Sequence, residues 1–448
     1  MEFDEALHYM EGLLRFGWKL GNERFEALCE RLGNPQDRYR IIHIAGTKGK
    51  GSTTALTAAI LHAAGYRVGA YFSPYVYDVR ERVQVNGGLI PREDFARLIT
   101  LARPHIEALA LTELGQTTEF ELKTLLGFLY FAEQEVDFAC IEVGIGGRLD
   151  ATNVVKPAVT VITNIGLDHT NILGETHALI AAEKAGILKP GTPCFTAAEH
   201  PEALEVITRI AAERRAPLVR VRRGQASGQT GAAGDVLWSV GGEEQTGPVT
   251  VATAAHLYQE MPLRMGGLYQ RANAACAVAA AERALAAQGQ ALPEEAVRAG
   301  LATTTLPGRL TVIRRLDGPL VVLDGAHNAL AAEALAGPLA ILRQQYDIRR
   351  MFLVIGMVGG HAPEGVLAAL AQGVERIYVC QPDWKRALPA EEIAQVARNY
   401  TPHVVVIPSV LKAARAALDA AGSDTLVLIT GSFYTVGEAP PSSLFTSG

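Results

Sequence analysis

The chain has 448 residues, of which 49% are hydrophobic and 20% charged, and its formal net charge is −6 at pH 7. These values are typical of a globular protein, and the length favours two domains over a single core. The negative charge argues against a nucleic acid or an acidic membrane surface as the partner, whereas a small anionic substrate needs only local cations.

The sequence has no pattern that predicts export or a membrane span. The N-terminal residues MEFDE are acidic and begin an amphipathic pattern, unlike a signal peptide. No apolar run approaches the roughly 20 residues that cross a bilayer. The five cysteines lie far apart, without the spacing of a metal or redox site. They predict buried thiols in a reducing compartment, so we expect a cytoplasmic protein.

The first strong pattern is an apolar strand over 40–45 that meets a glycine-rich turn, followed by a helix over 52–64. Glycines let backbone N–H groups surround phosphate oxygens, and the helix N-terminus adds a partial positive charge. Lys50 is placed to reach the β- and γ-phosphates, and the hydroxyl of Ser52 or Thr53 to face Mg²⁺. The turn departs from the usual P-loop at two positions, and its plainer interpretation is an ordinary strand-to-helix connection. We predict a phosphate-binding loop.

Strands and helices alternate along the following residues. We predict strands over 67–72, 137–143 and 158–163, and helices over 92–108, 120–135, 177–188 and 270–287. The nearly continuous apolar strands indicate a parallel sheet covered on both faces. The stretch 220–247 is rich in Gly, Ser and Thr and predicts a small antiparallel insertion or an edge hairpin.

A second α/β series follows the segment 306–309. Its predicted strands cover 320–323, 351–355, 376–379, 403–407 and 425–429. The predicted fold class is therefore α/β, with a P-loop-containing parallel-sheet ATPase domain followed by a smaller Rossmann-like α/β domain. We place the first domain at 1–297, with a small β insertion at about 218–250, and the second at 298–448.

Polar residues stand at the carboxyl ends of the predicted strands, where ligands bind in open parallel sheets. Ser73, Glu142 and His169 each lie at or after such an end, and Lys184 lies on a mostly apolar helix. Taken singly, they are explained as a turn serine, a carboxylate paired with an arginine, and a loop histidine. Together they favour Mg²⁺ or Mn²⁺ bound beside the phosphates of a nucleotide.

The second domain has a similar strand end at Asp324-Gly325-Ala326-His327-Asn328. An Asp-Gly turn with an asparagine helix cap would explain the same residues. Another strand runs into the segment 430–434. Two such ends that face the first domain would form a small-molecule site between the domains.

Several segments together resemble folylpolyglutamate synthase and dihydrofolate synthase, within the Mur ligase superfamily of ATP-dependent amide-forming ligases. The resemblance runs from about residue 3 to residue 438. It rests on HIAGTKGKGS (43–52), FSPYVYDVRERVQVNG (72–87), TTEFE (117–121), EVGIGGRLDATN (142–153), TNIGLDHTNILG (163–174), AAEKAGILK (181–189), LPGRL (306–310), LDGAHN (323–328) and GSFYTVGE (431–438). Each segment alone is weak, but their joint order and spacing are specific.

The resemblance implies ligation of L-glutamate to a folate or dihydropteroate carboxylate through an acyl phosphate. It implies ATP with one or two Mg²⁺ ions, or Mn²⁺, and a monomer without a nucleic-acid or membrane partner. The implied roles are a phosphate loop of Gly49, Lys50, Gly51 and Ser52; metal ligands Ser73, Glu142 and His169; and Lys184, carried as a carbamate beside the second metal.

The remaining implied roles concern the nucleotide and the two acids. Asn273, Arg309 and Asp324 match nucleotide-binding positions; Thr118, Phe120, Leu149, Asp150 and Ala151 match the pterin-side pocket; and His327 and Ser432 lie in motifs near the incoming glutamate. His327 is the candidate general base for the glutamate amine.

Two alternatives stay open. Another Mur-type amide ligase, of the peptidoglycan kind, usually has a UDP-sugar-binding domain before its ATP loop, whereas about forty residues precede Gly46 here. A P-loop kinase or GTPase with a binding module would not explain the convergence of Glu142, His169 and Lys184 with the cluster at 324–327. ATP hydrolysis that depends on both glutamate and a pterin carboxylate would discriminate between these functions.

Overall fold

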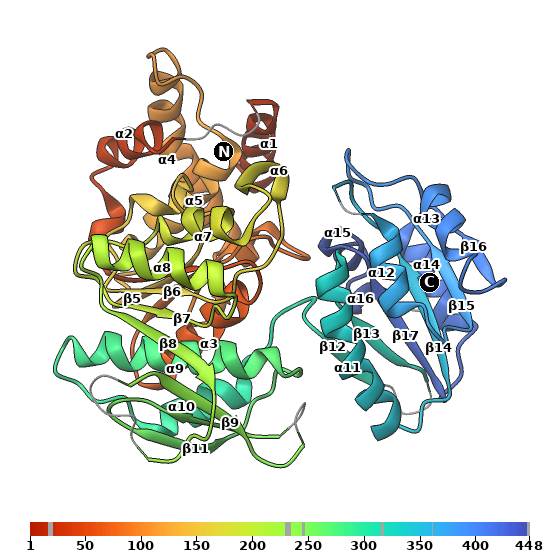
Figure 1. Ribbon diagram of the computed structural model, residues 1–448. Coiled ribbons are helices and arrows are strands. Elements are labelled where there is room, and N and C mark those ends of the chain that lie inside the picture. Colours follow the sequence, from red (N-terminus) through yellow and green to blue (C-terminus); the bar gives the residue numbers. More distant parts are fainter. Residues whose placement is uncertain (17–20, 229–233, 244–246, 315–317, 361, 446–448) are drawn as a thin grey trace. The chain divides into compact units, whose positions relative to one another are not determined.

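A computed structural model describes residues 1–16, 21–228, 234–243, 247–314, 318–360 and 362–445 (Figure 1). The chain forms two units. The first comprises Met1–Pro74, Arg80–Arg264 and Tyr269–Thr304, and the second comprises Tyr75–Val79, Met265–Leu268 and Thr305–Gly448. The domain boundary predicted at 297/298 falls within helix α10 (Glu294–Thr303). The main segment of the second unit begins after that helix, at Thr305.

The described part of the first unit contains one sheet in the order β11-β10-β9-β8-β7-β6-β1-β5-β2-β3-β4. Pairing is parallel from β9 through β2 and antiparallel at both edges. The strands are β1 (Arg40–Ala45), β2 (Val68–Tyr71), β3 (Val83–Val85), β4 (Gly88–Leu89), β5 (Phe138–Glu142), β6 (Val159–Ile162), β7 (Cys194–Thr196), β8 (Leu218–Arg223), β9 (Val236–Val240), β10 (Val249–Ala252) and β11 (Leu257–Met261).

Helices cover this sheet, and α1 and α2 precede its first strand in the chain. They are α1 (Phe3–Gly12), α2 (Glu23–Arg31), α3 (Lys50–Ala63), α4 (Arg92–Ala110), α5 (Glu119–Glu133), α6 (Thr170–Leu173), α7 (His177–Ala185), α8 (Pro201–Glu213), α9 (Tyr269–Ala286) and α10. α7 packs beside α8, and α3 beside α9 and α10 (Figure 1). The alanine-rich α9 is buried along most of its length, so small side chains let it lie close to α3.

The second unit has a sheet in the order β12-β13-β17-β14-β15-β16, parallel except for β12. Its elements are β12 (Thr311–Arg314), β13 (Leu320–Leu323), α11 (Ala329–Gln345), β14 (Arg350–Ile355), α12 (Pro363–Leu370), β15 (Arg376–Val379), α13 (Ala390–Ala397), β16 (Val404–Val406), α14 (Val410–Asp419), β17 (Thr425–Thr430), α15 (Phe433–Gly437) and α16 (Pro441–Leu444). Alternate residues of β13 enter two cores, Val322 with α11 and α12, and Val321 with α14. Helices therefore cover both faces, as continuous apolar strands require.

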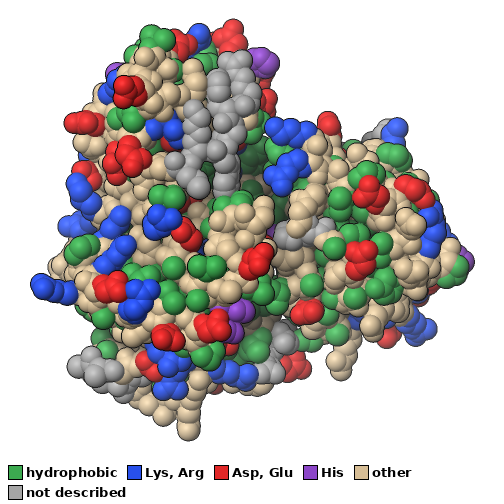
Figure 2. Space-filling model, turned by 45° about the horizontal axis from the view of Figure 1, so that its top comes forward, with side chains coloured by type: hydrophobic (Ala, Val, Ile, Leu, Met, Phe, Trp, Pro, Cys, Tyr) green, Lys and Arg blue, Asp and Glu red, His purple; other side chains and the backbone are tan. Residues whose placement is uncertain are grey.

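The predicted α/β fold is confirmed, and one region differs in detail. The stretch predicted as a small antiparallel insertion or an edge hairpin extends the main sheet. β8 pairs in parallel with β7, and β9 to β11 continue the sheet as an antiparallel edge. Residues 229–233 and 244–246 of that stretch lie outside the described residues. Within the described residues, every helix is too short or too polar to cross a bilayer. On the face shown in Figure 2, basic and acidic side chains are interspersed.

Candidate functional site

The glycine-rich turn after β1 is shaped to begin a helix at Lys50. Gly49 occupies the N-cap of α3 with a left-handed φ of 86°, a conformation that glycine adopts without strain. The side-chain amide of Asn273, from α9, fills the space where a Cβ on Gly49 would lie. The structure thus brings the predicted phosphate loop and the predicted nucleotide residue Asn273 into contact.

The segment after β6 fixes the phosphate loop from the other side. The Lys48 backbone N–H donates to Asn164 Oδ1 at 2.7 Å, and Thr163 Oγ1 donates to the Lys48 carbonyl at 2.6 Å. Thr47 Oγ1 donates to the Gly166 carbonyl at 3.1 Å and accepts from the Gly166 N–H at 3.0 Å. Sequence reasoning weighed this segment only for His169 and missed its role in holding the loop.

Two lysines meet at a single backbone carbonyl. Lys50 Nζ and Lys184 Nζ both donate to the Gly46 oxygen, at 3.1 and 3.0 Å. Lys184 is buried, and burial together with the charge of Lys50 lowers its pKa to about 7. Much of Lys184 is therefore a neutral amine near neutral pH, unlike an ordinary surface lysine.

Glu142 joins the start of α3 to the segment after β2. It ends β5 in register with Ile44 of β1, and its Oε2 accepts the backbone N–H of Ser73 at 2.9 Å. A Cβ on Gly51 would lie 3.2 Å from the same oxygen, so the carboxylate packs against the first turn of α3. Ser73 and Glu142 are thus brought together next to the phosphate loop.

His169 stands at the N-cap of α6, exposed, with a left-handed φ of 50°. It follows Asp168, whose carboxylate forms a 2.8 Å ion pair with Lys48 of the loop. The oxygen atoms of Glu142 and Ser73 and the imidazole of His169 have the donor chemistry that suits Mg²⁺ or Mn²⁺. Glu142 Oε2 lies against the first turn of the phosphate-loop helix, whereas the structure relates His169 to the loop through its neighbour Asp168.

The predicted pterin-side residues gather around Gly144. A Cβ there would lie 2.5 Å from the Phe120 ring and 3.0 Å from Asp150 Oδ2, so these two side chains converge on one backbone position. Asp150 is buried between the half-buried Leu149 and the buried Ala151. Burial raises its pKa, against the lowering effects of its hydrogen bonds and of the Lys50 charge.

Thr118 begins the helix that carries Phe120. Its hydroxyl accepts the Glu121 N–H, and Glu121 in turn accepts the Thr118 N–H at 2.7 Å, which forms a capping box. Arg24 pairs with the same Glu121 at 2.8 Å in a buried contact. The Thr-x-x-Glu spacing signals the cap, whereas nothing in the sequence pairs Glu121 with Arg24, which lies 97 residues away.

The second unit holds the other predicted residues at the carboxyl end of β13. Asp324 accepts the N–H groups of Leu310 and Ala326, and burial raises its pKa, while the Arg309 charge lowers it. The Arg309 guanidinium lies 4.3 Å from the centre of the Phe433 ring, a cation–π contact.

His327 and Ser432 lie within the second unit near the same ring. His327 Nδ1 lies 2.8 Å from the Gly325 carbonyl, which can only accept, so Nδ1 carries the proton and Nε2 is the basic nitrogen. The His327 and Phe433 rings are 6.2 Å apart. Ser432 is buried and caps α15 by accepting the Thr435 N–H.

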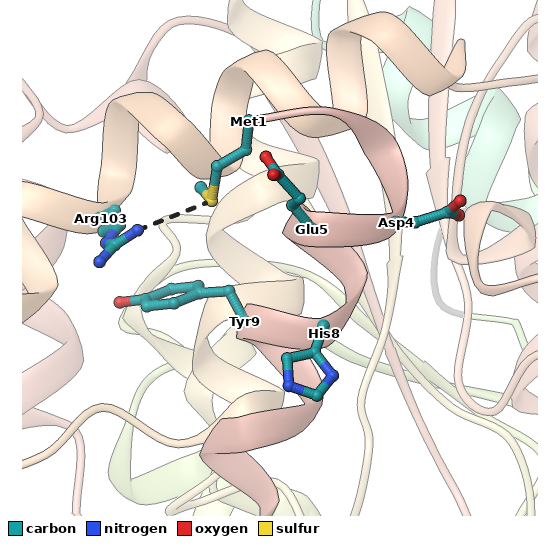
Figure 3. Close-up of a pocket in the computed structure, with 6 residues that line it drawn as sticks. All are labelled: Met1, Asp4, Glu5, His8, Tyr9 and Arg103. Carbon is teal, nitrogen blue, oxygen red and sulfur yellow. Dashed lines mark hydrogen bonds between the residues drawn. The ribbon is translucent and has the colours of Figure 1, made fainter.

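A separate pocket of about 540 Å³ lies between α1 and α4 (Figure 3). Met1, Asp4, Glu5, His8, Tyr9 and Arg103 line it. The Arg103 guanidinium stacks 5.2 Å from the centre of the Tyr9 ring and contacts the Met1 sulfur. None of the predicted site residues lines this pocket.

Comparison with known proteins identifies the family of this chain. Residues 44–281 match the Mur ligase middle domain, and residues 308–433 match the Mur ligase glutamate ligase domain. The chain is 37% identical, over 97% of its own length and 98% of the relative's, to the dihydrofolate synthase/folylpolyglutamate synthase of Bacillus subtilis.

Two solved structures share the fold and contain ligands. Escherichia coli FolC in complex with DHPP and ADP has a TM-score of 0.82 at 33% identity, over 98% of this chain and 96% of that one. A bifunctional folylpolyglutamate synthase/dihydrofolate synthase with Mn, AMPPNP and L-glutamate bound has a TM-score of 0.80 at 32% identity, over 98% of this chain and 97% of that one.

Proposed function

Because the chain belongs to the folylpolyglutamate synthase/dihydrofolate synthase family of Mur ligases, we propose that it uses ATP to ligate L-glutamate to the carboxylate of dihydropteroate or a folate. The observation that carries this proposal is the gathering of Lys50, Lys184 and the Glu142–Ser73 pair around one phosphate loop. A cationic loop with an adjoining carboxylate suits a nucleotide triphosphate and its divalent ion.

The reaction has two steps. A carboxylate is a poor acyl donor because its leaving group would be oxide. Transfer of the ATP γ-phosphoryl group to a carboxylate oxygen releases ADP and gives an acyl phosphate, whose phosphate then leaves as the glutamate amine attacks the carbonyl carbon. The first step brings two anions together, so Lys50 neutralises part of their charge and aligns them. A divalent ion bound at Glu142, Ser73 and His169 would supply further charge neutralisation.

Lys184 is proposed to act as a carbamate, which forms when its amine adds carbon dioxide. Carbon dioxide adds to a neutral amine and not to an ammonium, and the pKa of Lys184, about 7, leaves much of the amine neutral. Its nitrogen already lies at the phosphate loop, 3.0 Å from the Gly46 oxygen. The carbamate converts a buried cation beside Lys50 into an anion that can pair with Lys50 and help hold a second metal.

His327 is the proposed general base for the amine of glutamate. Its Nδ1 proton is engaged by the Gly325 carbonyl, so the lone pair resides on Nε2. Arg309 and Asp324 are proposed to bind the nucleotide, and Ser432 to lie near the incoming glutamate. The pterin-side pocket is assigned to the residues that converge on Gly144.

The test is an assay of purified protein with ATP, Mg²⁺ and glutamate, run separately with dihydropteroate and with tetrahydrofolate. We expect ADP formation over many turnovers to require glutamate together with at least one of the two pterin acids. Lys50→Ala should abolish ligation and keep the wild-type circular dichroism spectrum. ATP hydrolysis that ignores both acids, or normal turnover by the folded Lys50→Ala protein, would contradict the proposal.

We also propose that the enzyme is a cytoplasmic monomer. All five cysteines are buried thiols, and burial raises the pKa of each, which suits a reducing compartment. Sedimentation of the purified protein should give the mass of one chain. A stable dimer at assay concentration would overturn this part of the proposal.

A further inference from the structure

His43 is a fully buried titratable residue that the proposed mechanism does not use. It lies within β1, in register with Ile141 of β5 and Thr160 of β6. Its side chain points to the same face of the sheet as that of Ala45, which packs with residues of α7. A histidine buried in an interior strand of the sheet needs a polar partner, because an unpaired buried imidazole is costly.

That partner is Thr152, in the short 3₁₀-helix Ala151–Val154. His43 Nε2 lies 2.9 Å from Thr152 Oγ1, and Thr152 Oγ1 donates to Asp150 Oδ1 at 2.6 Å. A hydroxyl has one proton, so when Thr152 donates to Asp150 its oxygen can only accept from His43. The order is therefore His43 Nε2–H to Thr152 Oγ1–H to Asp150 Oδ1.

Two further observations fix the direction of the hydrogen bonds from His43 through Thr152 to Asp150. His43 Nδ1 is buried and has no hydrogen-bond partner among the described residues, so a proton on it would meet no acceptor. Burial and the nearby charge of Lys189 also lower the pKa of His43 to about 3, so the ring is neutral at physiological pH. A neutral ring with its single proton on Nε2 is a fixed donor.

The other end of this series of hydrogen bonds reaches the side chains that converge on Gly144. Asp150 Oδ1 also accepts the Thr152 backbone N–H at 3.0 Å, and Oδ2 accepts the Ile145 N–H at 2.9 Å. Three hydrogen bonds thus set the orientation of one buried carboxylate. Through Oδ2, that carboxylate holds the backbone at Ile145, next to Gly144 and the Phe120 ring.

We propose that His43 and Thr152 are positioning residues that orient Asp150 and the 144–146 backbone for binding of the pteridine ring. This inference rests on the proposed function, because it assigns the Gly144 pocket to the pterin acid. A pteridine ring offers N–H donors, and a carboxylate fixed in one orientation binds them without the entropic cost of being ordered. The two residues act through Asp150 and contact neither ATP nor the reacting carboxylate.

The test compares matched pairs of variants. Thr152→Val removes the hydroxyl at nearly constant side-chain shape, whereas Thr152→Ser keeps it. In the second pair, His43→Leu removes the N–H donor, whereas His43→Gln keeps an N–H near the position of Nε2. We expect Thr152→Val to raise the KM for the pterin acid roughly tenfold, as expected for a lost hydrogen bond to a charged group. His43→Leu should raise the same KM by less, because His43 donates to the neutral hydroxyl of Thr152. The KM for ATP should stay unchanged, and the conservative variants should remain close to wild type.

Hydrogen exchange at the Ile145 amide supplies a readout that is independent of turnover. Thr152→Val should accelerate exchange there, and Thr152→Ser should not. Equal losses of pterin and ATP affinity, or an unchanged Ile145 amide, would overturn the inference, as would a Thr152→Ser protein as impaired as Thr152→Val. Failure of the proposed function has a different signature: wild-type protein would show no pterin-dependent turnover, and the assignment of the pocket would fall with it.

Discussion

At the scale of single residues, the contact of Lys50 and Lys184 with one carbonyl explains why one of them should be neutral. Two ammonium groups at 3.1 and 3.0 Å from the Gly46 oxygen repel each other, and Lys184 is the more deeply buried. Desolvation and repulsion both disfavour its charged form, and its pKa falls to about 7. Lys50, the less buried of the two, is the proposed phosphate-binding cation.

We predict that Lys184→Ala loses ligase activity and that bicarbonate or a short-chain carboxylic acid partly restores it. The fold should survive, because the Gly46 carbonyl keeps its bond from Lys50. Lys156→Ala is the matched control, since Lys156 is exposed and pairs with Asp37 at the surface. Activity measured with and without added acid tests this, and full activity of Lys184→Ala without added acid would remove the carbamate role.

The buried imidazole of His43 makes stability depend on pH. Its pKa falls from the ordinary 6.5 to about 3 on folding, so between these values the unfolded chain binds more protons than the folded one. The free energy of unfolding should therefore fall as pH drops from about 6.5 towards 3.

Urea unfolding at several pH values measures this effect, with His43→Gln as the control that lacks the titrating group. We expect the wild type to lose more stability on acidification than His43→Gln does. Parallel pH dependences of the two proteins would show that other groups account for the acid sensitivity.

At the scale of elements, α3 is flanked by two left-handed glycines that differ in their surroundings. Gly49 precedes it with φ 86° and has the Asn273 side chain where a Cβ would lie, whereas Gly65 follows it with φ 94° and has open space there. An alanine costs about 1–2 kcal/mol at either position because of the left-handed backbone. Only at Gly49 does it also displace a proposed nucleotide-binding residue.

We therefore predict that Gly49→Ala raises the KM for ATP by roughly tenfold or more, whereas Gly65→Ala lowers stability without changing that KM. Steady-state kinetics and thermal unfolding of both variants separate the two effects. An unchanged KM in Gly49→Ala would show that Asn273 does not depend on the space beside the loop.

The regular elements near the site were predictable because their apolar spacing is unambiguous. β1 was predicted at its observed bounds, and α3, α5, α7 and α9 at bounds within two or three residues of those observed. The pairing of β8 with β7 was not predictable, since Gly- and Ser-rich composition signals a turn but carries no information on which strand lies alongside.

The candidate site shows the same division. The sequence identified side chains that follow strands, such as Glu142, because the carboxyl ends of parallel strands meet at one edge. It missed the hydrogen bond from the Lys48 N–H to Asn164, two residues that lie 116 positions apart in sequence. It also missed the contact of His43 with Thr152, which lie 109 positions apart. Such partners are set by the packing of the whole unit and leave no local pattern.

At the scale of the whole molecule, the chemistry is divided between two units. The first contains the phosphate loop, the Glu142–Ser73 pair and the side chains that converge on Gly144. The second contains the Asp324–His327 turn and Ser432. Ligation needs phosphoryl transfer and amine attack in succession, so each unit alone should be inactive, and an activated acid should arise only when ATP and a pterin acid are both bound.

The most direct test of the acyl phosphate follows one carboxylate oxygen of the pterin acid into the released phosphate. The pterin acid is labelled with isotopically heavy oxygen in its carboxylate, and the inorganic phosphate released with ATP and glutamate is analysed by mass spectrometry. Because the carboxylate oxygen that accepts the phosphoryl group departs with it, we predict one heavy oxygen in the phosphate for every amide formed. Amide formation with phosphate that contains no label would contradict the account.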